Sequence, residues 1–332
     1  MTPCRKLRNS PTEVSNVTLD GMTIPHRDAG PLSSTAVVVV NYGSHALLEI
    51  NLAAVSSAAP EATYIVVDNF TSADEQDQLT RLGLSHRWTI VPMSTNTGFG
   101  QGVNAGVDVA IAAGCATVLV LNPDATIERE SLERLATAVS NDHTLMVAPI
   151  VRESNGRVWF GGADVLLDDG RMSNPKRRPE REGRPYKEWL SGACFAISTE
   201  LWVKAGGFDP DYFLYWEDVD LSIRVQRAGG HVAVDQTSEA IHDEGGTHTE
   251  RLRWRAKSET YYYYNIRNRL LYASKHVDAV QRKQWLKATP RVSYEILLQG
   301  GRTQFLLPWI PVRAYLRGIR DGRRFIRSHR HD

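Results

Sequence analysis

The chain has 332 residues, of which 42% are hydrophobic and 23% are charged, a composition typical of a globular protein and not of a disordered or fibrous one. Its 39 lysines and arginines nearly balance its 38 aspartates and glutamates, which excludes binding of a polyanion through overall charge, so no nucleic-acid partner is expected. The charge is uneven, because residues 301–332 hold eight arginines and two aspartates, a net charge of +6.

Cysteine usage and hydropathy indicate a cytoplasmic protein. The three cysteines, Cys4, Cys115 and Cys194, are far apart and form no CxxC pair, which excludes a disulfide scaffold and a cysteine-rich zinc module. The longest apolar runs, 36–40 and 116–121, are far shorter than the ~20 residues that span a bilayer. The first residues also lack the apolar core of a signal peptide.

In chain order, a polar, proline-punctuated lead-in precedes four short apolar runs that alternate with helix-compatible stretches. The predicted strands are 36–40, 64–67, 89–91 and 117–121, and the predicted helices between them are 45–58, 72–82 and 102–113. Buried apolar strands that alternate with helices of about 10 to 15 residues are typical of a parallel α/β sheet.

Beyond residue 150 this alternation stops. Short strands are predicted at 158–160 and 164–167, and the charged stretch 168–187 has no apolar periodicity, which predicts a long loop. Such a loop is either a lid or binding loop or a solvated surface excursion. From residue 249 the sequence becomes helical and basic.

Polar residues follow each strand of the first half, at the edge where open α/β sheets bind their ligands. They are Asn41 and Tyr42, Asp68 and Asn69, the glycine-rich run 96–106, and Asn122-Pro123-Asp124. A carboxylate such as Asp68 can accept hydrogen bonds from a ribose or a base edge. Asp124 offers the oxygen ligands that a hard divalent cation takes together with substrate phosphates.

A second acidic cluster lies in residues 213–220, FLYWEDVD, where three carboxylates stand among aromatic and aliphatic side chains. Neighbouring carboxylates in a partly apolar setting raise one another's pKa, which suits a general base. The alternative is that Glu217 and Asp218 only charge the first turn of the helix that follows. Tyr215 and Trp216 either stack on an acceptor sugar or pack in the core.

Seven motifs in series resemble those of the family 2 glycosyltransferases of GT-A fold. They are VVVVNY (37–42), VVDNFTSAD (66–74), NTGFGQGVNAG (96–106), LVLNPDATI (119–127), WLSGACFAI (189–197), GGFDPDYFLYWEDVDLSIRVQRAGG (206–230) and IHDEGGTH (241–248). The NPD form and the YWEDVDL segment are most similar to the rhamnosyltransferase branch. The resemblance implies an α/β GT-A fold, with a Rossmann-like, mostly parallel sheet flanked by helices and a helical, basic C-terminal extension.

Four regions follow from this resemblance. They are a polar lead-in at 1–34, a nucleotide-sugar-binding half at 35–150, an acceptor-binding and catalytic half at 151–250, and a helical, basic region at 251–332 that associates with a membrane.

The resemblance also implies roles for single residues. Asp218 matches the general base, and Glu217 orients the acceptor or the helix start. Asp124 and His242 match ligands of a Mg²⁺ or Mn²⁺ ion, although Asn122 replaces the first acidic residue of the usual DxD motif. The implied donor-site residues are Asn41, Tyr42, Asp68, Asn96, Gly98, Gly100, Asn104, Asn122, Asp124, Ser191 and Gly192; the acceptor-site residues are Tyr215 and Trp216.

The C-terminal tail mixes apolar residues with the arginines. The apolar residues are Phe305, Leu306, Leu307, Trp309 and Ile310. Basic amphipathic segments with Trp and Phe lie on anionic membrane surfaces. We therefore predict peripheral association with the inner face of the cytoplasmic membrane. The alternatives are a solvated basic helix end and a contact within a homo-oligomer.

Together these expectations describe a metal-dependent, inverting glycosyltransferase. The expected donor is dTDP-L-rhamnose, and the expected acceptor is a polyprenyl-diphosphate-linked saccharide in the synthesis of cell-wall polysaccharide. One alternative is a family 2 transferase that uses a UDP-linked galactofuranosyl or hexosyl donor. The other is a catalytically silent module that binds a sugar nucleotide.

Overall fold

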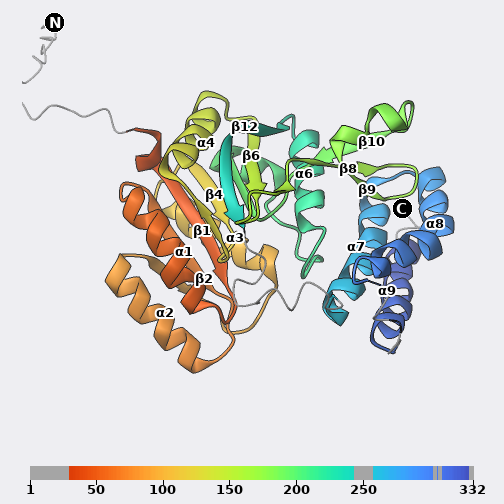
Figure 1. Ribbon diagram of the computed structural model, residues 1–332, viewed down its shortest axis with the longest axis horizontal. Coiled ribbons are helices and arrows are strands. Elements are labelled where there is room, and N and C mark those ends of the chain that lie inside the picture. The colour runs from red at the N-terminus through yellow and green to blue at the C-terminus, as the bar shows by residue number, and fades with distance from the viewer. Residues whose placement is uncertain (1–29, 243–256, 302–304, 306–308, 329–332) are drawn as a thin grey trace, which may run out of the picture.

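The computed structural model describes residues 30–242, 257–301, 305 and 309–328. Most of the predicted lead-in, the second part of the motif at 241–248, and Leu306 and Leu307 lie outside these residues. Figure 1 shows an α/β unit built on a central sheet, with three helices (α7–α9) on one side of it next to α6.

Twelve strands lie in the described residues. They are β1 (Thr35–Asn41), β2 (Thr63–Asp68), β3 (Thr89–Pro92), β4 (Thr117–Leu121), β5 (Ala125–Ile127), β6 (Leu145–Arg152), β7 (Val158–Phe160), β8 (Ala163–Leu166), β9 (Met172–Ser173), β10 (Tyr186–Trp189), β11 (Cys194–Ser198) and β12 (His231–His242). The four strands predicted in the first half are confirmed as β1–β4, and every residue of β1 and β4 is buried.

Nine helices of the α type lie in the same residues. They are α1 (His45–Ala58), α2 (Ala73–His86), α3 (Phe99–Ala112), α4 (Arg129–Asn141), α5 (Thr199–Ala205), α6 (Glu217–Arg227), α7 (Glu259–His276), α8 (Ala279–Leu298) and α9 (Trp309–Ser328). Short 3-10 helices stand at Pro31–Ser34, Pro175–Arg177 and Pro179–Arg181. The predicted helices are confirmed as α1–α3, and α3 begins three residues earlier than expected.

The main sheet has the strand order β3-β2-β1-β4-β11-β6-β12-β5, with β7 beside β6. β1 runs parallel to β2 and β4, and β2 runs parallel to β3. β11 is antiparallel to both β4 and β6, so β6 and its parallel neighbour β12 run in the direction of β1. The expected mostly parallel sheet flanked by helices is confirmed, and this one sheet unites the two predicted halves of the domain.

The prediction of a long loop at 168–187 was wrong in part. Residues within it form β9, two 3-10 turns and the start of β10, and β10-β8-β9 make a small second sheet. Ion pairs hold this segment, because the buried Asp164 binds Arg178 at 2.6 Å and Arg181 at 2.7 Å. Because ion pairs and not apolar contacts hold this segment, its sequence shows no apolar periodicity from which the structure could be predicted.

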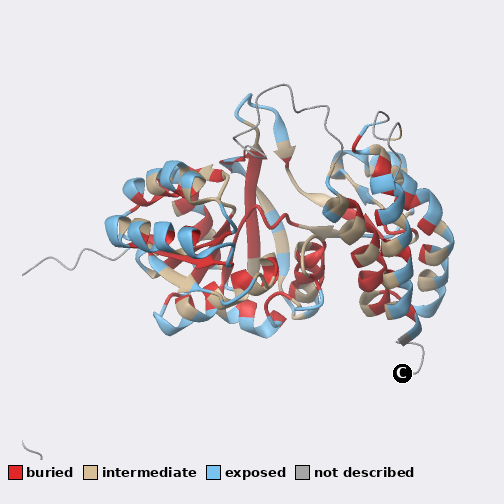
Figure 2. Cartoon of the chain, turned by 90° about the horizontal axis from the view of Figure 1, so that it is seen from below, coloured by how far each residue is buried: buried red, intermediate tan, exposed pale blue. Residues whose placement is uncertain are grey.

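The helices α7, α8 and α9 enclose further buried regions beside the sheet. Figure 2 shows buried residues both in the sheet and among these helices. α9 lies directly on α7, because an added Cβ at Gly318 would come within 3.0 Å of Ile266 and one at Gly322 within 2.8 Å of Leu270. Across the described ranges, no helix is both long and apolar enough to cross a membrane.

Candidate active site

The topology brings the predicted site residues to one edge of the sheet. β1, β2, β4 and β12 run in one direction, so Asn41, Asp68, Asn122 and His242 stand at or just beyond their carboxyl ends. The antiparallel β11 begins at the same edge, because its first residue pairs with Leu121. The Asn122 amide accordingly donates to the Ala193 carbonyl at 2.9 Å.

Asp218 is held at this edge by backbone amides. Its Oδ2 accepts a hydrogen bond from Gly192 N at 3.1 Å, and its Oδ1 accepts one from Val219 N at 2.8 Å. Burial raises the pKa of this carboxyl to about 6, while the two amide hydrogen bonds favour the charged form. The residue as a whole remains partly exposed. A carboxylate with this pKa can take a proton near neutral pH.

Glu217 differs from its neighbour, because it is only 5% exposed. Burial, and then the charge of Asp218, raise its pKa well above the ordinary range. Its Oε2 has no hydrogen-bond partner in the described part of the chain. The two adjacent carboxyls therefore differ in environment, and Asp218 is the one that solvent reaches.

A strained turn leads into the helix that carries both acids. Tyr215 has a φ of 65° and Trp216 a φ of 75°, the left-handed region that bulky side chains avoid. Asn268 on α7 is fully buried and donates from Nδ2 to the Leu214 carbonyl at 2.9 Å and to the Tyr215 carbonyl at 2.7 Å. These bonds compensate for the strain and fix the start of α6.

A second contact from α7 holds the next turn of α6. Asp220 is fully buried, with Oδ1 2.6 Å from His276 Nε2 and Oδ2 2.7 Å from the Arg224 guanidinium. Burial alone would raise the pKa of Asp220, but the hydrogen bond from His276 and the charge of Arg224 lower it below its usual value. Asp220 is thus a structural acid, and α7 clamps α6 at two points.

The glycine-rich run 96–106 packs against the segment that precedes α6. Gly98 has a φ of 87°, and a Cβ there would overlap the Phe213 carbonyl, which accepts a hydrogen bond from Phe99 N at 3.1 Å. A Cβ at Gly100 would lie 2.9 Å from that of Phe208. These contacts require glycine at both positions, because a side chain there would collide with the segment that precedes α6. The role of the two glycines beside the donor stays a prediction.

Asp124 and His242 form the pair expected to hold a cation. β5 and β12 pair so that His242 lies opposite Ala125, and His242 Nε2 is 3.1 Å from Asp124 Oδ1. Asn122 Nδ2 lies 3.4 Å from the same nitrogen. Trp159 covers the imidazole at a centroid distance of 4.6 Å. The carboxylate oxygen of Asp124 is the ligand type that Mn²⁺ and Mg²⁺ prefer, and His242 places an imidazole nitrogen beside it.

This pair supplies only part of a coordination shell. In the stretches that the structure describes, no group of three or more His, Cys, Asp or Glu side chains is placed to hold a metal ion. Protein sites for Mg²⁺ commonly use one or two carboxylates and leave the other positions to substrate phosphates and water. The residues therefore fit a cation that arrives with a phosphorylated ligand.

Asp68 is the second acidic residue at the sheet edge. It is fully buried, and neither carboxylate oxygen accepts a hydrogen bond of good geometry from the described residues, although the Gln76 side chain and the Phe70 amide lie near enough to lower its pKa in part. Burial raises its pKa above the ordinary value. A buried carboxylate with open acceptor positions is unfavourable unless a ligand fills them. Asp68 is therefore available to the hydroxyl or amide hydrogens of a bound nucleoside.

Three predicted donor-site amides instead hold the protein's own turns. Asn41 donates to Glu75 at 2.8 Å, and Asn96 accepts from Gly98 N at 2.9 Å. Asn104 donates to the Phe208 carbonyl and accepts from the Phe208 amide, both at 2.8 Å. Their side chains are used inside the fold, so they shape the site without offering these groups to a ligand.

The remaining predicted residues divide by exposure. Tyr42 is 55% exposed beside β1, whereas Ser191 is 7% exposed. Trp216 is only 5% exposed and packs against Tyr272 and Trp285. Of the two predicted alternatives for Trp216, the structure therefore favours core packing over stacking on a sugar. Tyr215 is half-buried, and its role toward the acceptor stays a prediction.

Sequence reasoning missed Asn268, His276 and Glu75. Asn268 lies in a segment interpreted only as helical, and its partners are carbonyls more than 50 residues earlier, so no local motif marks it. Glu75 directly follows the motif at 66–74, and it binds both Asn41 and His45. Glu75 lies in the first turn of α2, where an acidic residue is common because it stabilises the start of a helix, so the sequence did not mark it as part of the site.

Comparisons with known proteins agree with this geometry. The model of glycosyl transferase family 2 matches residues 36–202. An N-acetylglucosaminyl-diphospho-decaprenol L-rhamnosyltransferase of Mycobacterium tuberculosis is 29% identical over 62% of this chain and 75% of its own. The low-salt glycan biosynthesis hexosyltransferase Agl10 of Haloferax volcanii is 23% identical over 75% of this chain and 80% of its own.

Solved structures share the fold. GalNAc-T7, solved with UDP, GalNAc and Mn²⁺, superposes with a TM-score of 0.52 at 17% identity over 82% of this chain and 58% of its own. The mannosyltransferase PcManGT of Pyrobaculum calidifontis, solved with GDP-Man and Mn²⁺, gives 0.51 at 15% identity over 89% and 85%. The fold is therefore GT-A-like, and the family match covers half of the chain. The chain belongs to glycosyl transferase family 2 and is a glycosyltransferase.

Proposed function

We propose that this glycosyltransferase moves L-rhamnose from dTDP-L-rhamnose to a polyprenyl-diphosphate-linked saccharide, with inversion at the anomeric carbon. The observation that carries the proposal is Asp218, a partly exposed carboxylate with a pKa of about 6, held against Gly192 at the sheet edge where Asp124 and His242 meet. The rhamnosyltransferase relative from Mycobacterium tuberculosis supports the choice of sugar and of a lipid-linked acceptor.

The donor is proposed to lie across the carboxyl ends of β1, β2 and β4. The open acceptor positions of Asp68 favour a nucleoside at that end of the crevice. Asp124, beyond β4, would then face the diphosphate. The same order places the sugar near the Ser191–Gly192 turn, which lies next to β4 through the bond between Asn122 and Ala193.

Asp218 is proposed to act as the general base. Its carboxylate takes the proton of the acceptor hydroxyl while the hydroxyl oxygen forms a bond to the anomeric carbon. The bond from that carbon to the diphosphate oxygen breaks on the opposite face, and the nucleoside diphosphate leaves with the electron pair. The amides of Gly192 and Val219 keep the carboxylate aimed and favour its charged form.

Asp124 and His242 are proposed to hold Mg²⁺ or Mn²⁺ with the donor diphosphate. The cation would supply positive charge to the leaving group. His242 Nε2 is the nitrogen that faces Asp124, and its Nδ1 is buried with no partner in the described residues. Because the acceptor is lipid-linked, we place the enzyme at the cytoplasmic face of a membrane as a peripheral protein.

The test is a transfer assay with dTDP-L-rhamnose and a short-chain, water-soluble diphosphate acceptor. The native protein should form the rhamnosylated product, and Asp218→Asn should lower turnover on the order of 10²- to 10⁴-fold while it still binds donor. Asp108→Asn, which changes an exposed acid on α3, is the matched control and should keep native turnover. Near-native turnover of Asp218→Asn would refute the assignment of the base.

A further inference from the structure

The solvent-facing side of α9 combines large apolar residues with arginines. The 3.6-residue period places Trp309, Leu316, Arg323 and Arg327 on one face of this helix. Trp309 is 81% exposed and Leu316 is 60% exposed, and the two arginines are exposed as well. We call these four residues the outer stripe of α9. Its first half is apolar and its second half is basic.

The opposite face of α9 is fully used inside the protein. Ala314 is buried, and Gly318 and Gly322 let the helix approach Ile266 and Leu270 of α7 closely. α9 is therefore not a free amphipathic helix that could turn its packed face to a membrane. Whatever binds α9 must bind the outer stripe, on a helix that the rest of the fold already holds in place.

The arginines of α9 are not all neutralised. Residues 309–328 include six arginines and one acidic residue, Asp321. Arg320 and Arg324 share that aspartate, at 2.9 and 3.2 Å. Arg323 and Arg327, one helical turn apart, have no ion-pair partner in the described part of the chain. Two like charges so close favour an anion between or above them.

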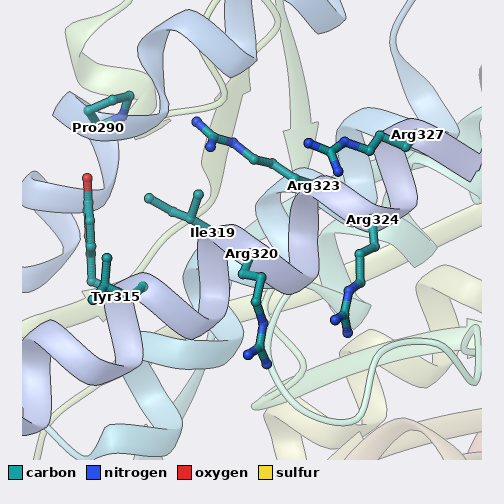
Figure 3. Close-up of a pocket in the computed structure, with 8 residues that line it drawn as sticks. Pro290, Tyr315, Ile319, Arg320, Arg323, Arg324 and Arg327 are labelled. Atoms are coloured by element: carbon teal, nitrogen blue, oxygen red, sulfur yellow. The ribbon is translucent and has the colours of Figure 1, made fainter.

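Arg323 and Arg327 also line a groove between α8 and α9. The groove has a volume of about 520 Å³, and its apolar wall includes Pro290, Leu316 and Ile319. Figure 3 shows Arg323 and Arg327 extending on the side of Pro290, whereas Arg320 and Arg324 extend on the other side of α9. The groove thus offers unpaired guanidinium groups above an apolar wall.

We infer that the outer stripe of α9 binds the surface of an anionic phospholipid membrane, with Arg323 and Arg327 on lipid phosphates and Trp309 and Leu316 among the acyl chains. Guanidinium groups pair well with phosphate oxygens, and exposed Trp and Leu favour the membrane interface. A polyanion without acyl chains would leave Trp309 and Leu316 without a partner. The inference rests on the proposed function, because a lipid-linked acceptor requires an enzyme at the membrane.

The experiment is flotation of the full chain with vesicles of phosphatidylcholine alone or mixed with an equal amount of phosphatidylglycerol. The native protein should float with the mixed vesicles only, and added salt should weaken the binding. Each arginine at an anionic surface changes partition about fivefold, so Arg323→Gln with Arg327→Gln should lower it about 25-fold. Trp309→Ala with Leu316→Ala should lower it as well.

The matched control is Arg81→Gln with Arg157→Gln, which removes the same charge from exposed arginines on α2 and near β7. This pair should float like the native protein, and an equal loss would show that only overall charge matters. Native flotation of the Arg323/Arg327 variant would overturn the inference. So would a loss of self-association in that variant with flotation unchanged, which would assign the stripe to a second copy of the chain.

Two further measurements are needed. One distinguishes lipid phosphate from free phosphate as the ligand, and the other distinguishes failure of this inference from failure of the proposed function. Inorganic phosphate should not release the protein from vesicles more than chloride of equal ionic strength does; stronger release would mean a free-phosphate site. The Arg323/Arg327 variant should transfer sugar normally to a water-soluble acceptor. If the native protein floats as expected but transfers no sugar, the proposed function fails and the membrane site stands.

Discussion

At the scale of single residues, the site depends on adjacent carboxyls with different environments. Asp218 is partly exposed and bound to two amides, Glu217 is buried with an open oxygen, and Asp220 is neutralised by His276 and Arg224. The sequence shows these three acids as one cluster. Only the positions of α6 and α7 distinguish the proposed base from the acids that are buried or paired.

The raised pKa of Asp218 leads to a prediction about pH. Burial raises this pKa to about 6, so the base is protonated below that pH and charged above it. We expect kcat/KM to rise tenfold per pH unit below pH 6 and to level off above pH 7. Initial rates with dTDP-L-rhamnose between pH 5 and 8 measure this. A profile that stays flat across that range would argue against Asp218 as the base.

At the scale of elements, the turn that leads to the proposed base, Asp218, depends on close backbone contacts. The residues before α6 rest on the first turn of α3 at Gly98 and Gly100 and are held from α7 by Asn268. The family match ends at residue 202, so α6 and α7 lie beyond it. The proposed base is therefore positioned by α3, which lies inside the matched region, and by α7, which lies outside it.

This arrangement predicts different effects for two glycine substitutions. Gly114 has a φ of 79° and open space around it, so Gly114→Ala should lower the free energy of unfolding by about 1 kcal/mol and leave kcat unchanged. Gly98→Ala adds an overlap with the Phe213 carbonyl, so it should lower the free energy of unfolding by about 3 kcal/mol and reduce kcat as well. Urea unfolding and initial rates measure both.

The two glycines provide each other's control, because both have positive φ and only Gly98 meets another backbone. Equal losses of stability and native kcat in both variants would show that the contact between α3 and the segment that precedes α6 does not position the base.

The elements also show how much the sequence could predict. β1–β4 and α1–α3 were predicted because apolar runs and helical stretches alternate locally. β6, β11 and β12 were not predicted, because they break the local alternation of strand and helix and pair with strands far along the chain. Asp68 and Asp124 were expected at one sheet edge because each follows a strand of the parallel sheet, and the expectation that Asp218 joins them came from the family resemblance. Asn41, Asn96 and Asn104 were predicted to bind the donor, and only the structure shows that their side chains bind other parts of the protein.

At the scale of the whole molecule, α7 connects two surfaces. One side of α7 holds α6 and the turn before it through Asn268 and His276, and another side carries α9 with its arginines. Figure 1 shows these helices next to each other, on one side of the sheet. Truncation of the tail at residue 301 would therefore remove the support of α7 together with the proposed membrane site. Point substitutions on the outer stripe separate the two effects.

The central claim is a nucleotide-sugar site that a divalent cation completes. Calorimetric binding of dTDP, UDP and GDP, each with and without Mn²⁺, tests it most directly. We predict that dTDP binds only when Mn²⁺ is present and that Asp124→Asn weakens this binding. Metal-dependent binding of UDP instead would favour the galactofuranosyl or hexosyl donor. If the folded protein bound none of the three nucleotides, the assignment of a donor site at this sheet edge would be wrong.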